Sequence, residues 1–284
     1  MSPGEAKSRW GCRGLAARTG RRGKEVRREM GDVWRGFVEA LKLIGRLDPY
    51  VMKITLFTLY VCAIATLAGM LLGIPLGSAL AVYRFRGRKL LVTLVNAGMG
   101  LPPVVVGLFV YMFLKRRGPL GFLNWLYTPK AIVLAEIVLA MPLIAGITMA
   151  ALQNVDPKLR MQARSLGAGE AGSLLTLLRE TRLSLLAAVI AGFGGIISEV
   201  GAAMMVGGNL LVGGEPYTRT LTTATVLEVS KGDSERAIAL GIILLGITVL
   251  LVWVMTLMQQ GTPLSHPARV ARNLFTRRGR EEAA

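Results

Sequence analysis

The chain is poor in the residues that build disulfide, metal and catalytic sites. It has two cysteines, Cys12 and Cys62, and a single histidine, His266. Cys62 falls inside a long apolar run, so the two thiols cannot form a disulfide framework, and no cluster has metal-ligand spacing. A phosphate-binding loop of the form Gly-x4-Gly-Lys-Ser/Thr is missing, and so is any nucleophile–base–acid set. These shortages argue against an enzyme, and any ATP-derived energy would have to come from a partner.

Charge is also scarce over long stretches of the chain. Apolar residues make up 52% of the sequence and mean hydropathy is +0.51, which is too hydrophobic for an ordinary soluble domain. A helix needs about 20 mostly apolar residues to cross a bilayer. Five windows meet this length, with Glu136 and Glu199 as their only charges: 54–82, 90–114, 131–155, 183–205 and 237–258. The sequence therefore predicts an all-α polytopic membrane protein with about five spans, within a transmembrane domain over 51–260.

The two ends of the chain have the opposite character. Residues 1–29 contain nine Lys or Arg and three Glu, with no apolar signal-peptide core. Such a segment could bind nucleic acid or anionic lipid, but its composition favours a basic disordered tail. We expect no nucleic-acid partner, a native start at Met30 and a dispensable 1–29 segment. Residues 261–284 form a second basic tail, expected in the cytoplasm.

Residues 30–50 separate the basic tail from the first apolar window. Trp34, Phe37, Val38, Leu41 and Ile44 recur at helical spacing, and charged residues occupy the opposite side. The segment is too short and too charged to span. It is interpreted either as an amphipathic helix in the membrane interface or as a helix packed against the spans.

The polar segment 156–182 is the most informative part of the chain. Asp156-Pro157 is a good helix start, and a helical stretch is expected over 158–166. Gly167-Ala168-Gly169 interrupts it, and a second amphipathic stretch follows to Arg182. Two short helices around a glycine turn form either a docking element or an ordinary connection with a glycine cap.

Charge counting gives this segment a side of the membrane, though not decisively. With five spans, its side carries 14 Lys or Arg and the other side carries 11, not counting residues 1–29. This bias places 156–182 in the cytoplasm. Including the nine basic residues of 1–29 would reverse the count.

Several motifs resemble one family of transporters. Met161-Gln162-Ala163-Arg164-Ser165-Leu166-Gly167 resembles the cytoplasmic loop of bacterial ABC importer permeases, with Met161 in place of the usual Glu and Gln162 in place of an Ala. Stretches 101–107 and 197–209 resemble molybdate, sulfate and tungstate permeases. Stretches 156–160, 178–182 and 217–233 resemble the tungstate branch.

The resemblance implies a type I ABC importer transmembrane fold in a homodimer. It also implies two copies of an ABC ATPase subunit, which hold ATP and Mg, and an extracytoplasmic tungstate- or molybdate-binding protein. No cofactor is expected in this chain, which would lie in the cytoplasmic membrane in contact with lipid. The residues implied to couple to the ATPase are Leu159, Met161, Gln162, Ala163, Arg164, Ser165, Leu166, Gly167 and Ala168.

A second set of residues is predicted to form the translocation path or its gate: Pro102, Pro103, Glu199, Gly201, Met205, Asn209, Thr222 and Thr223. Prolines break helices and are tolerated where a span faces protein or water. A carboxylate would repel an anionic substrate, so Glu199 is predicted to have a structural or gating role. The threonine hydroxyls and Arg219 either contact an anion or hold the 207–236 segment against the spans.

The function inferred from these features is that of a permease subunit, not an enzyme, of an ATP-driven oxyanion importer. Tungstate is the preferred substrate, and molybdate or sulfate is the nearest alternative. An ATPase-independent secondary transporter would instead show inverted repeats, and none is evident. A membrane scaffold without transport would leave the two-helix loop unexplained.

Overall fold

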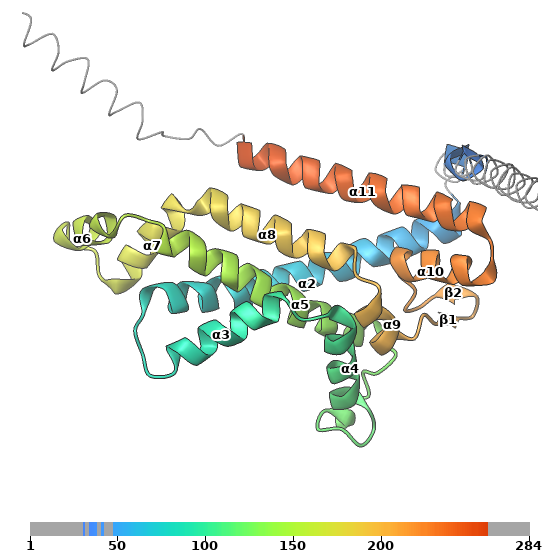
Figure 1. Ribbon diagram of the computed structural model, residues 1–284, viewed down its shortest axis with the longest axis horizontal. Helices are drawn as coiled ribbons and strands as arrows, with labels where there is room; N and C mark the ends of the chain where they lie inside the picture. The colour runs from blue at the N-terminus through green and yellow to red at the C-terminus, as the bar shows by residue number, and fades with distance from the viewer. Residues whose placement is uncertain (1–30, 32–33, 39–40, 43–47, 261–284) are drawn as a thin grey trace, which may run out of the picture.

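The computed structural model describes residues 31, 34–38, 41–42 and 48–260. The predicted tails at 1–29 and 261–284 lie outside these residues, as does about half of the interfacial helix expected at 30–50. The described chain is almost entirely helical, and its longest helices run side by side along the long axis of the molecule (Figure 1). The elements are α2 (Pro49–Val82), α3 (Arg88–Met99), α4 (Pro103–Leu114), the short 3-10 helix η1 (Gly121–Leu123), α5 (Pro129–Gln153), α6 (Pro157–Ser165), α7 (Glu170–Glu180), α8 (Arg182–Ile197), α9 (Gly201–Gly207), the two-residue strands β1 (Leu211–Val212) and β2 (Glu215–Pro216), α10 (Leu221–Lys231) and α11 (Ser234–Gln260).

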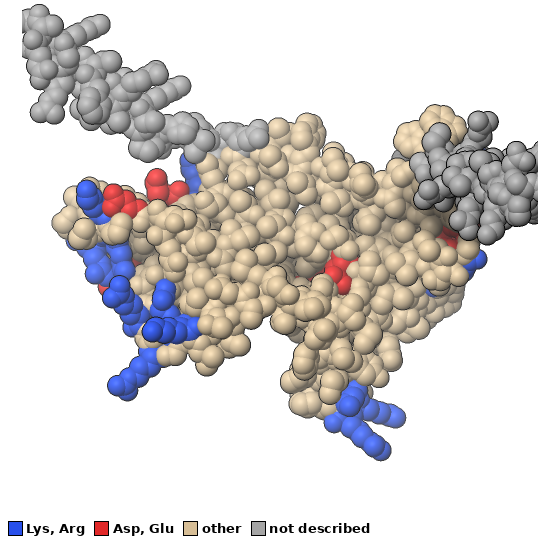
Figure 2. Space-filling model, in the orientation of Figure 1, with Lys and Arg blue, Asp and Glu red and all other residues tan. Residues whose placement is uncertain are grey.

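Within the described residues, three helices are long and apolar enough to cross a membrane, namely α2, α5 and α11. Two bent helix pairs, α3 with α4 and α7 with α8, raise the number to five if each pair is one span. In the view of Figure 2, Lys and Arg gather at the left end of the molecule and at the tip of its lower projection, and the broad surface between them shows no Lys or Arg and only one small acidic patch. This distribution fits a membrane-embedded protein and confirms the predicted fold class.

Helix α2 packs against α5 through small residues. The position where a side chain would start on Gly73 lies 2.9 Å from the carbonyl oxygen of Met141 and 3.0 Å from Cβ of Ile144. Gly69 and Gly77, one turn away on either side, also face α5. Small residues four apart let two membrane helices approach closely, and this contact forms the centre of the bundle.

A larger residue at Gly73 should therefore loosen the bundle. We expect Gly73→Leu to destabilise the chain by about 1–3 kcal/mol, the usual range for overpacking, or to prevent its insertion. Thermal unfolding of the chain in detergent measures this effect. The matched control is Gly246→Leu on α11, where nothing lies within 4 Å; equal losses from both substitutions would contradict the close α2–α5 contact.

The expected span over 90–114 is not one continuous helix. Helices α3 and α4 meet at 112°, with Gly100 ending α3 and Pro103 beginning α4. Pro102 is extended, with φ −61° and ψ 125°, because the ring of the following proline disfavours the helical region for the residue before it. Two consecutive residues also lack an N–H to continue the ladder. The Pro102-Pro103 pair thus redirects the chain.

The expected span over 183–205 is also interrupted. Helix α8 ends at Ile197, and a separate seven-residue helix, α9, follows from Gly201. At 1.5 Å per residue the 16 residues of α8 are shorter than the hydrocarbon core, which is about 30 Å thick. The bent α7–α8 pair, at 70°, is the fourth candidate span instead.

The described part of the N-terminal segment lies against α11. Gly36 is buried so close to Ile238 that a Cβ atom added at the glycine would clash with it, and Arg35 forms an ion pair of 2.9 Å with Glu235. Trp34 and Phe37 stack on each other and stay exposed. One face of this segment thus packs on a span, while its aromatic face is free of the bundle.

Candidate functional site

The α6–α7 element lies at one end of the molecule, beyond the ends of the long helices (Figure 1). The Asp156 carboxylate accepts the backbone N–H of Lys158 at 2.9 Å, and Pro157 is the first helical residue. Both features satisfy the start of α6 as the sequence predicts. The helix then runs nine residues, to Ser165.

A glycine cap ends α6. Gly167 has φ +89°, in the left-handed region. The N–H of Ala168 donates to the carbonyl of Ala163, and the N–H of Gly167 donates to the carbonyl of Arg164, both at 3.0 Å. This pair of hydrogen bonds is a Schellman motif. The turn between the two helices is therefore defined by hydrogen bonds.

Two arginines join α6 to α7. Glu170, the first residue of α7, accepts hydrogen bonds from Arg164 and, at 3.1 Å, from Arg160. Arg160 also donates to the carbonyl of Val82 at 3.4 Å, where α2 ends. Sequence reasoning did not single out Arg160 or Glu170, although opposite charges ten residues apart across a glycine turn are a detectable signal.

Two apolar side chains are exposed on the α6–α7 element, one on α6 and one at the C-cap of α6. Met161 is 62% exposed and Leu166 is 88% exposed, and α6 has no buried residue. All nine predicted coupling residues lie on α6 or on its C-terminal turn. An ordered helix that buries none of its apolar side chains is suited to contact another protein.

The predicted path and gate residues lie toward the other end of the molecule and form one connected region. Glu199 connects α8 to α9, and its Oε1 atom accepts the N–H of Ala202 at 3.0 Å. Gly201 contacts Val104 on α4. A Cβ atom added at Gly107, also on α4, would lie 3.2 Å from Cβ of Met205. Helices α4 and α9 are thus tightly packed just after Pro102 and Pro103.

The carboxylate of Glu199 is therefore a helix cap. We expect Glu199→Ala to destabilise the protein by about 1 kcal/mol, as loss of an N-terminal cap does, and to reduce transport with it. Glu199→Gln keeps an acceptor oxygen and should restore both. Measuring uptake and thermal stability on the two variants checks this. If Gln fails like Ala in uptake while stability stays normal, the negative charge itself acts in gating.

The threonine hydroxyls of the 207–236 segment already have partners. Thr222 donates to the carbonyl of Glu199 at 3.0 Å, and Thr223 donates to Oδ1 of Asn209 at 3.2 Å. Thr220 and Thr223 form a capping box at the start of α10. All three are buried. These hydroxyls join α10 to the carbonyl of Glu199 and to Asn209.

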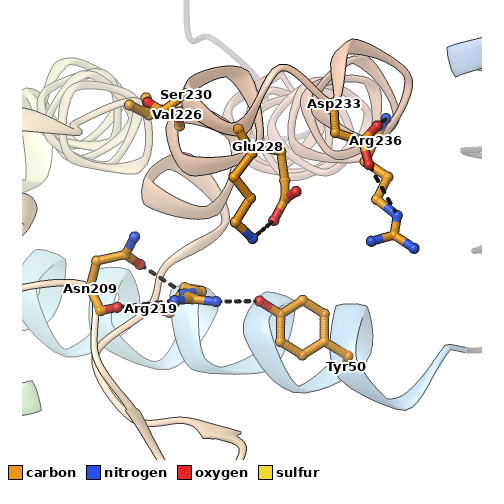
Figure 3. A network of polar contacts seen from close by, with 9 residues as sticks. Tyr50, Asn209, Arg219, Val226, Glu228, Ser230, Asp233 and Arg236 are labelled. Carbon is orange, nitrogen blue, oxygen red and sulfur yellow. Dashed lines mark hydrogen bonds and ion pairs between the residues drawn. The ribbon is translucent and has the colours of Figure 1, made fainter.

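Arg219 is at the centre of this network. The residue is buried, with 8% of its surface exposed. It donates to Oδ1 of Asn209 at 3.0 Å, to the carbonyl of Asn209 at 3.2 Å and to the hydroxyl of Tyr50 at 2.8 Å (Figure 3). Asn209 has φ +52°, which turns the chain so that both of its oxygens reach the same guanidinium. A second long-range bond joins the N–H of Leu221 to Oγ1 of Thr58, at 2.8 Å.

Sequence reasoning missed Tyr50 and Thr58, which anchor this segment to α2 from more than 160 residues away. Thr58 is one of several threonines in the apolar window 54–82, so its residue type alone did not distinguish it. Glu136, the other intramembrane acid, is 2% exposed on α5. Its Oε2 atom has no hydrogen-bond partner among the residues that the structure describes.

The comparison with known families identifies the chain. Residues 73–262 match the family described as binding-protein-dependent transport system inner membrane component. This match covers more than half of the sequence. The chain belongs to this family.

Curated relatives agree with the family match. The chain is 39% identical over 201 residues to a probable anion ABC transporter permease protein of Haloferax volcanii, covering 70% of this chain and 87% of the relative. It is 38% identical over 213 residues to the tungstate uptake system permease protein of Peptoclostridium acidaminophilum, covering 75% and 92%. A molybdenum transport system permease protein of Escherichia coli is 31% identical over 192 residues, covering 64% and 82%.

Solved structures agree on the fold. A methionine ABC transporter in an inward-facing conformation matches with a TM-score of 0.61 at 18% identity, covering 76% of this chain and 95% of that one. A bacterial alginate ABC transporter matches with a TM-score of 0.61 at 16% identity, covering 88% and 94%. The fold is that of an ABC transporter permease, and the protein is an inner-membrane transport component.

Proposed function

We propose that the chain is the membrane-spanning permease subunit of an ATP-driven oxyanion importer and that its substrate is tungstate. The similarity to the tungstate permease of Peptoclostridium acidaminophilum, over 92% of that protein, is the observation that carries the substrate. A molybdate importer is the second candidate, because molybdenum permeases are also relatives, at 31% identity. Sulfate has no comparable support among these relatives.

The exposed apolar residues of α6 support a separate ATPase as the energy source. In this proposal α6 docks on an ATPase subunit through Met161 and Leu166, and Ala163 and Gly167 allow a close approach. Two permease copies, two ATPase subunits and an extracytoplasmic binding protein complete the importer. Closure of the ATPases would move the paired α6 helices and switch the spans between inward-open and outward-open states.

The region around α4, α9 and α10 is proposed to form the gate. Pro102 and Pro103 direct α4 across the path, and Gly201 and Met205 hold it against α9. The buried hydroxyls and Arg219 keep the 207–236 segment fixed on α2, so that the segment presents one rigid surface to the binding protein. The same rigidity would let a small rotation of α4 open or close the path.

Reconstitution tests this proposal. The chain is placed in liposomes with its ATPase subunit, ATP and binding protein loaded with tungstate, molybdate or sulfate. We expect ATP hydrolysis and uptake to be stimulated most by the tungstate-loaded protein. Uptake driven by an ion gradient without the ATPase would instead establish a secondary transporter, and equal stimulation by molybdate would remove the tungstate assignment.

A further inference from the structure

A pocket lined by arginines lies at the α6 end of the bundle. It has a volume of about 430 Å³ and forms where the ends of α2 and α5 meet the starts of α3 and α6. Its charged lining residues are Arg84, Arg88, Arg160 and Asp156. Figure 2 shows Lys and Arg side chains gathered at this end of the molecule.

The three arginines retain hydrogen-bond donors that nothing in the described chain uses. Arg88 donates from Nε to the carbonyl of Leu80 at 2.7 Å, which fixes its guanidinium at the pocket and leaves the terminal nitrogens free of any described partner. The Nε atom of Arg160 is buried without a hydrogen-bond partner among the described residues. Arg84 is exposed and makes no hydrogen bond or ion pair within the described part of the chain.

The acidic groups nearby do not cancel this charge. Asp156 is the only acidic lining residue, and its Oδ1 is occupied by the N–H of Lys158. Glu170 neutralises part of Arg160 but also binds Arg164. Three cations therefore face one carboxylate. An arginine cluster with free N–H groups is suited to a phosphate, which accepts several such bonds at once.

The surroundings of the pocket identify the source of the phosphate. Arg84 lies two residues after the end of the apolar helix α2, between Tyr83 and Phe85, which are 41% and 44% exposed. Exposed aromatic residues at the end of a membrane helix lie at the headgroup level. Basic pockets between membrane helices bind anionic headgroups. We propose that this pocket binds the phosphate of an anionic phospholipid headgroup.

The proposal does not depend on the transported substrate or on the ATPase, because every residue involved is in this chain. It adds a consequence for α6. Arg160 bonds to the end of α2 and to α7, so a lipid phosphate at this pocket would join the membrane surface to the α6–α7 element.

Native mass spectrometry of the full-length chain in detergent tests the proposal, with phosphatidylglycerol or phosphatidylcholine added. We expect retained phosphatidylglycerol and little phosphatidylcholine. Replacing both arginines, Arg84→Gln with Arg88→Gln, should reduce phosphatidylglycerol binding by roughly tenfold or more, given the usual contribution of a basic residue near a headgroup. The matched control is Arg116→Gln with Arg117→Gln, two exposed arginines between α4 and η1, which should leave binding unchanged.

Two further variants separate binding from folding. Arg84→Gln alone removes no hydrogen bond of the described chain. Reduced phosphatidylglycerol binding by this variant would therefore report on the pocket and not on unfolding. The Arg84→Lys and Arg88→Lys pair keeps the charge and should retain more lipid than the glutamine pair. Unchanged phosphatidylglycerol binding in the Arg84→Gln, Arg88→Gln chain, or equal binding of phosphatidylcholine, would overturn the proposal.

Inorganic phosphate distinguishes the other source of the same chemistry. The chain is placed in nanodiscs made only of phosphatidylcholine, and its thermal stability is measured as phosphate is added. We expect no stabilisation at millimolar phosphate. Stabilisation that disappears in the Arg84→Gln, Arg88→Gln chain would overturn the lipid assignment and make the pocket a site for a free anion.

Discussion

Replacing Leu166 with Asp should abolish association with the ATPase subunit and leave the permease itself intact. Leu166 is 88% exposed, so the substitution removes no packing within the chain and should change its stability by less than about 0.5 kcal/mol. In the complex, the substitution removes an apolar contact and buries a carboxylate without a partner. Together these should weaken the binding free energy by more than about 2 kcal/mol, which lowers the affinity at least about thirtyfold. Co-purification and ATP hydrolysis stimulated by the loaded binding protein measure the effect.

Gly167→Glu tests the same docking surface at the turn that ends α6. The glycine has φ +89° with open space around it, so the substitution strains the backbone by about 1–2 kcal/mol and adds bulk where the partner would approach. Gly169→Glu is the matched control, because Gly169 has equally open space and an ordinary φ of −64°. Normal association in the Leu166→Asp and Gly167→Glu variants, with both inserted in the membrane, would reject docking through α6.

Replacing Arg219 with Met should release the 207–220 segment from α2. Asn209 and Tyr50 would lose their shared partner, and hydrogen bonds to a charged group contribute about 1.5–3 kcal/mol each when buried. We expect a loss of several kcal/mol by this scale, protease cleavage within 207–220 and loss of transport. Thermal unfolding and limited proteolysis measure the first two.

A nearby cation serves as the control for Arg219. Arg236 is exposed and pairs with Asp233 at 3.5 Å (Figure 3), and such surface pairs contribute about 0–1 kcal/mol. Arg236→Met should therefore be close to wild type. If Arg219→Met leaves stability and proteolysis unchanged but stops uptake, the guanidinium acts on the anion and not on the fold.

The sequence predicts the fold class because membrane helices follow from hydropathy alone. It also predicts the α6 start and its glycine cap, since Asp156-Pro157 and Gly167 determine local backbone geometry without distant contacts. The breaks at 101–103 and 198–200 were harder to place. Both lie inside windows that are apolar overall, with Pro102-Pro103 in one and Ser198-Glu199 in the other, and mean hydropathy does not register a change of direction.

The buried network around Arg219 was not predictable in detail. The partners of Arg219 and Leu221 on α2, Tyr50 and Thr58, are more than 160 residues distant in the chain, and local patterns carry no information on such pairs. The residue types left two roles open for the threonines and Arg219, contact with an anion or packing of the 207–236 segment against the spans. Each hydroxyl already has a hydrogen-bond partner within the chain, which favours the packing role over contact with an anion.

Arg160 has a mechanical consequence. Its guanidinium bonds at once to the last turn of α2 and to the first residue of α7, and the Schellman turn at Gly167 removes slack between α6 and α7. A displacement of α6 would therefore be transmitted in two ways: through Arg160 to α2, the longest helix of the bundle, and through α7 to α8. Arg160→Gln removes the bonds to Val82 and to Glu170, while Arg164 still holds Glu170. We expect the proposed ATPase subunit to stay bound and less substrate to be transported for each ATP hydrolysed, which uptake and ATP hydrolysis measured on the same liposomes would show.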